Sequence, residues 1–342
     1  MATERLISPA QAPEEETHNW ALRPRNLDEY VGQAELVERL LIAVEAVQTR
    51  SKARKDDTKE HLEHVLLHGP PGLGKTTIAH VIGAELGTKV HTTSGPALAR
   101  GTDLVAVLTR LQAGDVLFID EIHRLPVAVE EFIYPAMEDF RIDVCLDTGM
   151  NARTVQINCA PFTLIGATTR AGLLSSPLRS RFGITHHLRY YDESELKRIL
   201  SRSCSLLNVH EIESGSLERI ASRSRGTPRI ANRLLRRVRD FADVRAEGKL
   251  SEMIVDDALR LEGVDALGLD DLDRSYLRTI ANIYEGGPVG LEAVAATMNE
   301  DAGTLEDVVE PYLLQIGFLA RTRRGRALTA KACEHLGVPI PE

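Results

Sequence analysis

The chain has 342 residues and a formal net charge of −9, from 41 basic and 50 acidic residues. This balance argues against a protein that coats nucleic acid with its whole surface, but it allows a local basic patch. Four widely spaced cysteines argue against a disulfide framework and against a zinc site. The sequence has no apolar run of ~18 residues and no apolar signal region, so we expect a cytoplasmic protein with no membrane partner.

The sequence divides into four regions. Residues 1–18 are polar and rich in Pro and Glu, and we expect a mobile tail. From residue 19 to 191, apolar strand candidates alternate with helical patterns, which indicates a parallel sheet with helices on both faces. Residues 192–263 read as an all-helical domain, and residues 264–342 as helices followed by a compact unit with a strand pair. The sheet strands are predicted in EHVLLHG, TKVHTT, DVLFID, PFTLIGATT and ITHHLRYY.

One feature interrupts the α/β rhythm. RIDVCLDTG and ARTVQINCAPF alternate in polarity around a Gly-containing turn at residues 147–151. The period of two predicts a β-hairpin inserted into the α/β core.

A phosphate-binding pattern occupies residues 69–76. GPPGLGKT fits G-x-x-x-x-G-K-[ST] and lies between a predicted strand and a predicted helix, as the pattern requires. Glycines such as Gly72 and Gly74 let backbone N–H groups face the β- and γ-phosphates, and the helix N-terminus adds a positive dipole. Lys75 supplies a point charge, and the Thr76 hydroxyl is a ligand for Mg²⁺.

Two carboxylates form the second half of this site. Four apolar residues before Asp120 and Glu121 predict a strand that is buried on both faces. Ligands of open α/β sheets gather at the carboxyl ends of strands, so we expect Asp120 to hold Mg²⁺ and Glu121 to orient or deprotonate the attacking water. His123 is a candidate general base, but Glu121 already fills that role, which favours a structural or coupling role for His123.

Three further residues carry weaker signals on their own. Thr169 ends another apolar strand, and it would bond the γ-phosphate or the lytic water if that strand lies beside the Asp120 strand. Arg181 is an ordinary surface residue unless the chain oligomerises and the arginine reaches a neighbour's ATP. In that case it would raise the rate of hydrolysis by ~10³–10⁵-fold. Arg229 lies at a predicted helix start after a proline, from which it could swing toward the nucleotide.

Together these motifs resemble those of AAA+ ATPases, and more closely those of the RuvB family, hexameric motors that drive branch migration of Holliday junctions. The resemblance runs from about Leu22 to the C-terminus and includes GPPGLGKTT, LFIDEIHRL, TLIGATTRAG, SPLRSRFG, RGTPRIANRLLRRVRDF and EPYLLQIGFL. It implies an α/β fold in which an AAA+ P-loop sheet carries the inserted hairpin and is followed by a small all-helical lid domain and a C-terminal winged-helix domain.

The resemblance also implies cofactors and partners. The cofactors are ATP and Mg²⁺. The partners are duplex DNA at Holliday junctions, other copies of the chain in a homohexamer, and a RuvA-like junction-binding protein. No nuclease pattern is visible in the sequence, so junction cleavage would belong to a separate resolvase.

Individual roles follow from the resemblance. Lys75, Thr76 and Thr77 match Walker A, and Asp120 and Glu121 match Walker B. Sensor 1, the arginine finger that acts in trans and sensor 2 correspond to Thr169, Arg181 and Arg229. The other residues assigned to the nucleotide are Leu22, Arg23, Glu138, Asp139, Phe140 and Tyr191.

The inserted hairpin, roughly residues 141–157, resembles the docking element for RuvA. An exposed hairpin with an apolar row is an aggregation hazard unless a partner covers it. The row comprises Ile142, Val144, Leu146, Val155 and Ile157.

In the winged-helix unit, the charge pattern predicts a DNA contact through the strand pair. The helix candidate at residues 304–316 carries three acids and no basic residue, and Pro311 should kink or break it. The strand pair is basic instead, which favours a grip on backbone phosphates without base reading. Its DNA-binding candidates are Arg321, Arg324 and Arg326, with Arg323 standing where the family often has Pro.

Three functions are therefore open. An ATP-driven DNA translocase fits the most features. A clamp-loader-like or replication-initiator ATPase would share the nucleotide motifs, but the basic strand pair argues against a helical collar. A DNA-binding regulator that uses nucleotide as a switch fits the winged helix, but the acidic helix weakens base readout.

Overall fold

The computed structural model describes residues 20–53, 60–145 and 154–339. They form two compact units, one spanning Leu22–Tyr190 and the other containing Tyr191 and the residues after it. The predicted tail at residues 1–18 and the predicted hairpin turn lie outside the described residues. None of the described helices is long and apolar enough to cross a membrane.

The first unit is built on a five-stranded parallel sheet with the order β2-β3-β6-β1-β7. All of β6 and the four apolar residues of β3 are buried, as expected for strands covered on both faces. The five strands predicted from the apolar segments are all present. Their bounds are β1 (Val65–His68), β2 (Val90–Ser94), β3 (Val116–Asp120), β6 (Thr163–Thr168) and β7 (Ile184–His187).

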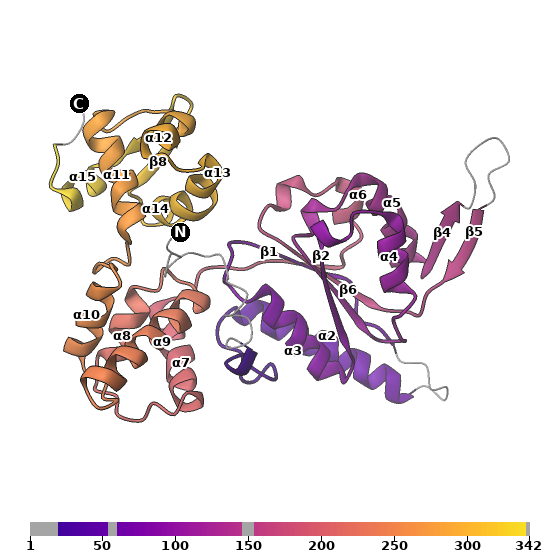
Figure 1. Ribbon diagram of the computed structural model, residues 1–342. Helices are drawn as coiled ribbons and strands as arrows, with labels where there is room; N and C mark the ends of the chain where they lie inside the picture. Colours follow the sequence, from indigo (N-terminus) through magenta and orange to yellow (C-terminus); the bar gives the residue numbers. More distant parts are fainter. Residues whose placement is uncertain (1–19, 54–59, 146–153, 340–342) are drawn as a thin grey trace. The chain divides into compact units, whose positions relative to one another are not determined.

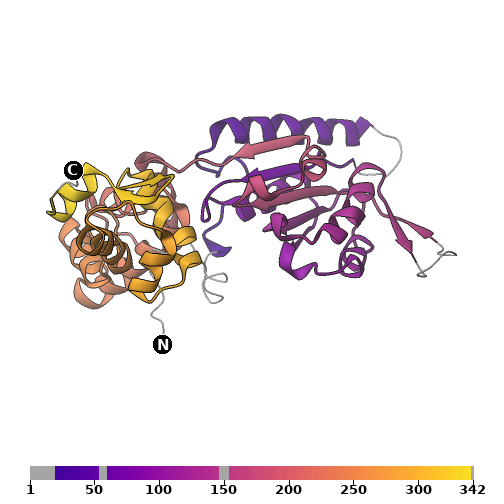
Figure 2. The ribbon, with the colours of Figure 1, turned by 90° about the horizontal axis from the view of Figure 1, so that it is seen from above.

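Helices cover both faces of this sheet (Figures 1 and 2). Helices α2 (Ala34–Ala53) and α3 (Lys75–Leu86) lie on one face, and α4 (Gly101–Leu108) and α5 (Val127–Glu138) lie on the other. Helix α2 buries an apolar stripe that repeats every three or four residues, as its sequence predicts. The stripe consists of Leu36, Leu40, Val44 and Val47.

The inserted hairpin consists of the antiparallel strands β4 (Arg141–Cys145) and β5 (Thr154–Asn158), which project from the sheet in Figure 1. Ile142 pairs with Ile157 across the two strands, so the predicted β-hairpin is confirmed. Ile142 is nevertheless fully buried in the core of the first unit, which removes it from any partner surface. Val155 is 41% exposed and Ile157 is half-buried, whereas Leu146 lies outside the described residues.

The second unit begins with four helices, α7 (Glu193–Leu206), α8 (Ser216–Ser222), α9 (Pro228–Arg245) and α10 (Glu252–Leu261). Helix α7 starts at a reciprocal cap, in which Asp192 accepts from the Glu195 N–H and Glu195 accepts from the Asp192 N–H. Helix α9 buries one apolar stripe, and the neighbouring Phe241 is half-buried. The stripe consists of Ile230, Leu234, Leu235, Val238 and Ala242.

The remaining residues form a winged helix with its own core. Its helices are α11 (Asp271–Ile283), α12 (Leu291–Met298), α13 (Ala302–Thr304), α14 (Glu310–Gln315) and α15 (Ala330–Leu336), and its antiparallel wing is β8 (Leu319–Thr322) and β9 (Gly325–Leu328). A π-helical turn, Leu305–Val309, interrupts the predicted helix directly before α14. The predicted break is confirmed, because Pro311 in the first turn of α14 cannot donate a backbone hydrogen bond.

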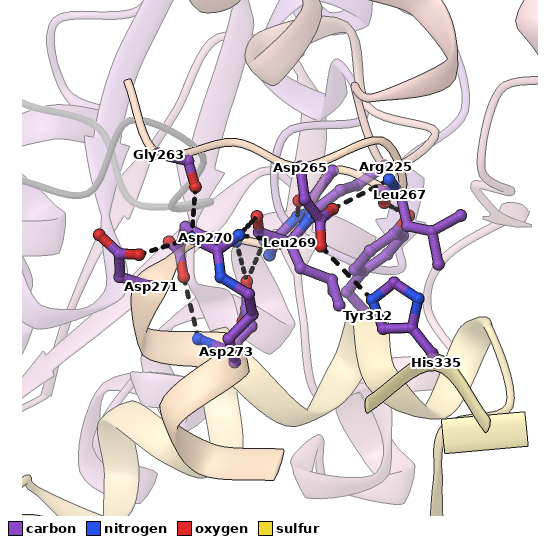
Figure 3. Close-up of polar contacts among 12 residues, drawn as sticks. Arg225, Gly263, Asp265, Leu267, Leu269, Asp270, Asp271, Asp273, Tyr312 and His335 are labelled. Atoms are coloured by element: carbon purple, nitrogen blue, oxygen red, sulfur yellow. Dashed lines mark hydrogen bonds and ion pairs between the residues drawn. The ribbon is translucent and has the colours of Figure 1, made fainter. Parts of the chain in front are cut away.

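A buried ion pair joins the segment before α9 to α11 (Figure 3). The Arg225 guanidinium pairs with the Asp273 carboxylate, and these side chains are only 3% and 0% exposed. Arg225 Nε also donates to the Gly268 carbonyl oxygen at 2.8 Å. The guanidinium carbon lies 4.7 Å from the ring centre of Tyr312, whose hydroxyl donates to the Leu267 carbonyl oxygen at 2.6 Å. A buried charge is tolerated only when it is paired, so these contacts hold the helical domain against the winged helix within this unit.

We expect Arg225→Ala to lower the free energy of unfolding by about 3–5 kcal/mol, because it leaves the Asp273 carboxylate buried without its cation. Urea unfolding followed by circular dichroism measures the loss. The matched control is Arg39→Ala, which removes an exposed pair with Glu35 and should cost about 0.5 kcal/mol. Equal losses in the two variants would contradict the structural role of Arg225.

Candidate functional site

The carboxyl ends of β1, β6 and β3 meet at one edge of the sheet. Strand β6 lies between the other two, with His68 opposite Thr168 and Ile119 opposite Gly166. Neighbouring strands are ~4.8 Å apart, so the loop after β1, the threonines at the end of β6 and the carboxylates after β3 lie within about 10 Å of one another. The structure therefore brings together the predicted Walker A, sensor 1 and Walker B residues.

The loop after β1 encloses the Lys75 side chain. Lys75 Nζ donates to the carbonyl oxygens of Gly69 at 2.8 Å and Pro70 at 2.9 Å, and the residue is only 7% exposed. A buried ammonium needs oxygen partners, and here the loop supplies them. The same ammonium is placed to exchange a loop carbonyl for a phosphate oxygen.

The backbone of this loop requires glycine. Gly69 has φ 137°, and a Cβ there would lie 2.8 Å from the Leu188 carbonyl oxygen. Gly74 has φ 96° directly before α3, and the first intrahelical hydrogen bond runs from the Ile78 N–H to the Gly74 carbonyl oxygen at 2.9 Å. The N–H groups of residues 75–77 therefore have no acceptor within the helix. Thr76 and Thr77 lie in this first turn, which is suited to bind an anion.

The Walker B carboxylates lie at a tight turn. Asp120 ends β3, and Glu121 follows with φ 49°, a conformation that is uncommon for residues other than glycine. The Glu121 N–H donates to Asp120 Oδ1 at 2.9 Å. Backbone strain of this kind is typical of functional sites, because the surrounding structure must hold it in place.

The donor set at this edge fits a magnesium ion that is bound together with a nucleotide. The Asp120 carboxylate and the Thr76 hydroxyl are hard oxygen ligands, and Mg²⁺ usually takes one or two such protein groups together with phosphate oxygens and water. Within the described ranges, no cluster of three or more His, Cys, Asp or Glu side chains could hold a metal by itself.

Arg181 is folded against its own chain. One terminal nitrogen donates to the Pro177 carbonyl oxygen at 2.7 Å, and Nε lies 3.2 Å from Glu138 Oε1. The guanidinium carbon also lies 4.5 Å from the ring centre of Tyr134. The structure therefore brings Arg181 and Glu138 together, a pairing that the spacing of the two residues in the sequence did not suggest.

Asp139 and Phe140 follow the end of α5. Asp139 pairs with Arg141 at 3.1 Å. The Phe140 ring centre lies 4.7 Å from that of His61 and 6.0 Å from that of Phe162, two residues that precede β1 and β6. These are the amino ends of the strands, so the structure does not bring Phe140 to the P-loop of its own chain.

The four remaining nucleotide residues belong to different units. Leu22 and Arg23 lie at the start of the first unit, and Leu22 is buried. In the second unit, the Tyr191 N–H donates to the Gly226 carbonyl oxygen at 2.9 Å, and Arg229 follows in the first turn of α9. The fold therefore groups Tyr191 with the segment that carries Arg229.

In the wing, a buried carboxylate binds two of the predicted DNA-contact arginines. Glu310 of α14 is fully buried and accepts from Arg321 Nε and Arg326 Nε, each at 2.8 Å, and from the Tyr276 hydroxyl at 2.6 Å. Burial alone would raise the pKa of Glu310, but the hydrogen bonds from Arg326, Tyr276 and Arg321 outweigh it, and the pKa lies below its usual value. Part of the positive charge of the wing is thus neutralised inside the domain.

The arginines at the tip of the wing differ from Arg326 in their exposure. Arg323 and Arg324 form the turn between β8 and β9, and both are exposed. The sequence shows the basic residues but not their partner, because Glu310 approaches them only when α14 packs on the wing. The two tip arginines are therefore better placed for phosphates than Arg326, whose side chain is only 18% exposed.

Three family descriptions match successive parts of the chain. Residues 22–188 match "Holliday junction DNA helicase RuvB P-loop domain". Residues 191–265 match "RuvB AAA lid domain", and residues 266–337 match "RuvB C-terminal winged helix domain". These matches cover both units of the structure.

Individual relatives agree with these matches. The Holliday junction branch migration complex subunit RuvB of Kosmotoga olearia is 53% identical over 335 residues, which are 98% of this chain and 95% of the relative. The solved structure of the Thermotoga maritima RuvB Holliday junction branch migration motor is 53% identical, with a TM-score of 0.83 over 94% of this chain and all of that one. A single-residue variant of the Thermotoga protein has the same TM-score of 0.83 over 93% of this chain. The chain, with its P-loop edge, lid and winged helix, belongs to the RuvB family.

Proposed function

We propose that this chain is an ATP-driven motor that moves duplex DNA and drives branch migration of Holliday junctions during recombination and repair. The observation that carries the proposal is the sheet edge where Lys75, Asp120 and Glu121 meet, in a chain that belongs to the RuvB family over its described length. The names of the Kosmotoga and Thermotoga relatives support the same function.

Residues of the first unit bind and hydrolyse ATP. Lys75 and the N-terminal amides of α3 hold the β- and γ-phosphates. Thr76 and Asp120 hold Mg²⁺, which supplies neutralisation of the phosphate charge when it is bound. Glu121 orients the attacking water and takes its proton, and Thr169 bonds the γ-phosphate or that water. The products are ADP and phosphate.

The nucleotide site is completed by a neighbouring subunit in a homohexamer. Arg181 leaves the Pro177 carbonyl oxygen and the Glu138 carboxylate and reaches the neighbour's γ-phosphate. Because Glu138 lies beside Arg181 in the same subunit, Glu138 and Asp139 approach the neighbour's nucleotide from the same side as Arg181. Arg229 then communicates the nucleotide state to the second unit, and the wing transmits the movement to DNA.

The proposal extends to partners and location. A RuvA-like junction-binding protein docks on the hairpin through Val155 and Ile157, of which Val155 is the exposed member. Junction cleavage belongs to a separate resolvase. A DNA substrate and buried, unpaired cysteines such as Cys159, Cys204 and Cys333 fit the cytoplasm.

Strand exchange on a synthetic four-way junction tests the function. With ATP, Mg²⁺ and a junction-binding RuvA, we expect branch migration by the wild-type chain and none by Lys75→Ala, because the variant lacks the charge that holds the phosphates. Resolution of the products on a native gel gives the rate. DNA-stimulated ATP hydrolysis without migration would contradict the motor function and favour a clamp-loader-like or switch function.

Complementation tests the shared site. Lys75→Ala keeps its arginine finger, and Arg181→Ala keeps its Walker A loop, so each variant alone should be inactive. In a one-to-one mixture, about one site in four would combine an intact loop with an intact finger if the finger acts in trans. We expect the mixture to recover a corresponding fraction of DNA-stimulated ATPase activity. A mixture that forms rings by sedimentation but stays as inactive as its components would exclude a finger that acts in trans.

The wing variants separate DNA contact from folding. Arg324→Ala should weaken duplex binding and reduce the slope of log K against log[salt] by about 0.9, the loss of one phosphate contact, without changing stability. Arg326→Ala should instead lower the free energy of unfolding by about 1–3 kcal/mol, because the Glu310 network loses a partner. Fluorescence anisotropy across a salt series and urea unfolding measure the two effects. An unchanged salt slope in Arg324→Ala would remove the tip from the DNA interface.

A further inference from the structure

A histidine ring connects the sensor strand to the Walker B glutamate. His123 lies in the short helix η2 (Ile122–Arg124), directly after the carboxylates, and its side chain is only 7% exposed. Its Nδ1 lies 2.8 Å from Thr168 Oγ1, and its Nε2 lies 3.4 Å from Glu121 Oε2. Thr168 is the last residue of β6 and is fully buried.

The hydrogen bonds of Thr168 favour one tautomer of the His123 ring. The Arg170 N–H donates to Thr168 Oγ1 at 3.0 Å, so this oxygen already serves as an acceptor. Since the buried Thr168 hydroxyl also needs an acceptor for its own proton, we assign that proton to His123 Nδ1 and the proton of the neutral imidazole to Nε2. This arrangement places an N–H, rather than a lone pair, opposite the Glu121 carboxylate. Burial lowers the pKa of the imidazole, although the charge of Glu121 opposes the shift, and the neutral form is favoured.

Glu121 is a residue whose position needs support. Its backbone is in the left-handed region, and its side chain is 35% exposed. On the other side of the His123 ring, the hydrogen bond from the Arg170 N–H to Thr168 Oγ1 closes the turn that carries Thr169. The sensor 1 residue and the glutamate are therefore connected through two side chains, those of Thr168 and His123.

We propose that His123 is a positioning residue for ATP hydrolysis, which as a neutral imidazole holds Glu121 in the orientation that activates the attacking water. Through Thr168, it links this orientation to the turn that presents Thr169 to the γ-phosphate. This inference rests on the proposed ATPase function. The ring exchanges no proton with the substrate, so it affects the hydrolytic step and leaves nucleotide binding to Lys75 and the N-terminus of α3.

Substitutions at His123 separate positioning from folding. His123→Ala should lower the kcat of DNA-stimulated ATP hydrolysis by about 10- to 100-fold, because a displaced catalytic group loses its alignment. Its KM and its affinity for a non-hydrolysable ATP analogue should stay within about twofold of the wild-type values, because the residues that bind the nucleotide are unchanged. His123→Gln restores an N–H donor in place of Nε2 and should recover most of the rate. A role in folding alone would lower analogue binding together with kcat and would not depend on the N–H.

Thr168 provides a second pair of variants that does not alter the ring. Thr168→Ser keeps the hydroxyl and should retain kcat, whereas Thr168→Val keeps the shape and should lower it as His123→Ala does. The matched control is His91→Gln in β2. His91 pairs with Asp115 at 3.0 Å and lies three residues before Ser94, the residue of β2 that is opposite Asp120. It should leave kcat unchanged.

The outcomes separate this inference from the proposed function. If the wild-type chain hydrolyses no ATP, or if Lys75→Ala hydrolyses it equally well, the proposed function and the inference are both overturned. If the wild type is active and Lys75→Ala is not, an unchanged kcat in His123→Ala or in Thr168→Val overturns the inference alone. If His123→Ala does not fold, the comparison of Thr168→Ser with Thr168→Val decides between the two roles.

Discussion

The parallel pairing of β6 between β1 and β3 is the constraint on which the site depends. It places three strand ends at one edge, so the loop that holds Lys75, the turn that carries Thr169 and the strained turn at Glu121 become neighbours. A strand order with a further strand between β1 and β3 would move the phosphate loop away from the carboxylates. The helix that starts at Lys75 then adds the N–H groups of its first turn at the same edge.

Buried carboxylates decide what the basic residues of the second unit can do. Asp273 holds Arg225 in the interior, and Glu310 holds Arg321 and Arg326 against the winged helix. A charge that is buried must be paired, so these arginines serve the fold before they can serve a ligand. The two arginines at the tip of the wing, Arg323 and Arg324, are exposed, and Arg321 keeps a side-chain exposure of 44% beside Glu310.

Much of the fold could be predicted because it follows from local patterns. Short apolar segments indicated the strands of the sheet, and alternation with a period of two indicated the hairpin. The strand pair of the wing was also predicted, and Pro311 indicated the break before α14. These local patterns did not show which side chains on a given face are covered by the core. A period of two places Ile142 and Ile157 on one face of the hairpin, but it does not show that the core covers Ile142 at the base of that face. Likewise, Phe140 adjoins acids assigned to the nucleotide, yet its ring packs at the opposite edge of the sheet.

The candidate chemistry of the site could be predicted from the sequence, because Walker A and Walker B depend on glycine, lysine and carboxylate spacing over a few residues. Which side chains meet across the chain depends on the tertiary fold. Thr168 and His123 are 45 residues apart, and Arg225 and Asp273 are 48 apart. Contacts over such distances leave no local pattern, since they arise when a strand end, a short helix or a helix start is brought to its neighbour by packing. For this reason, the candidate residues for hydrolysis and a structural or coupling role for His123 could be suggested from the sequence, whereas the contacts of His123 with Thr168 and Glu121 are visible only in the fold.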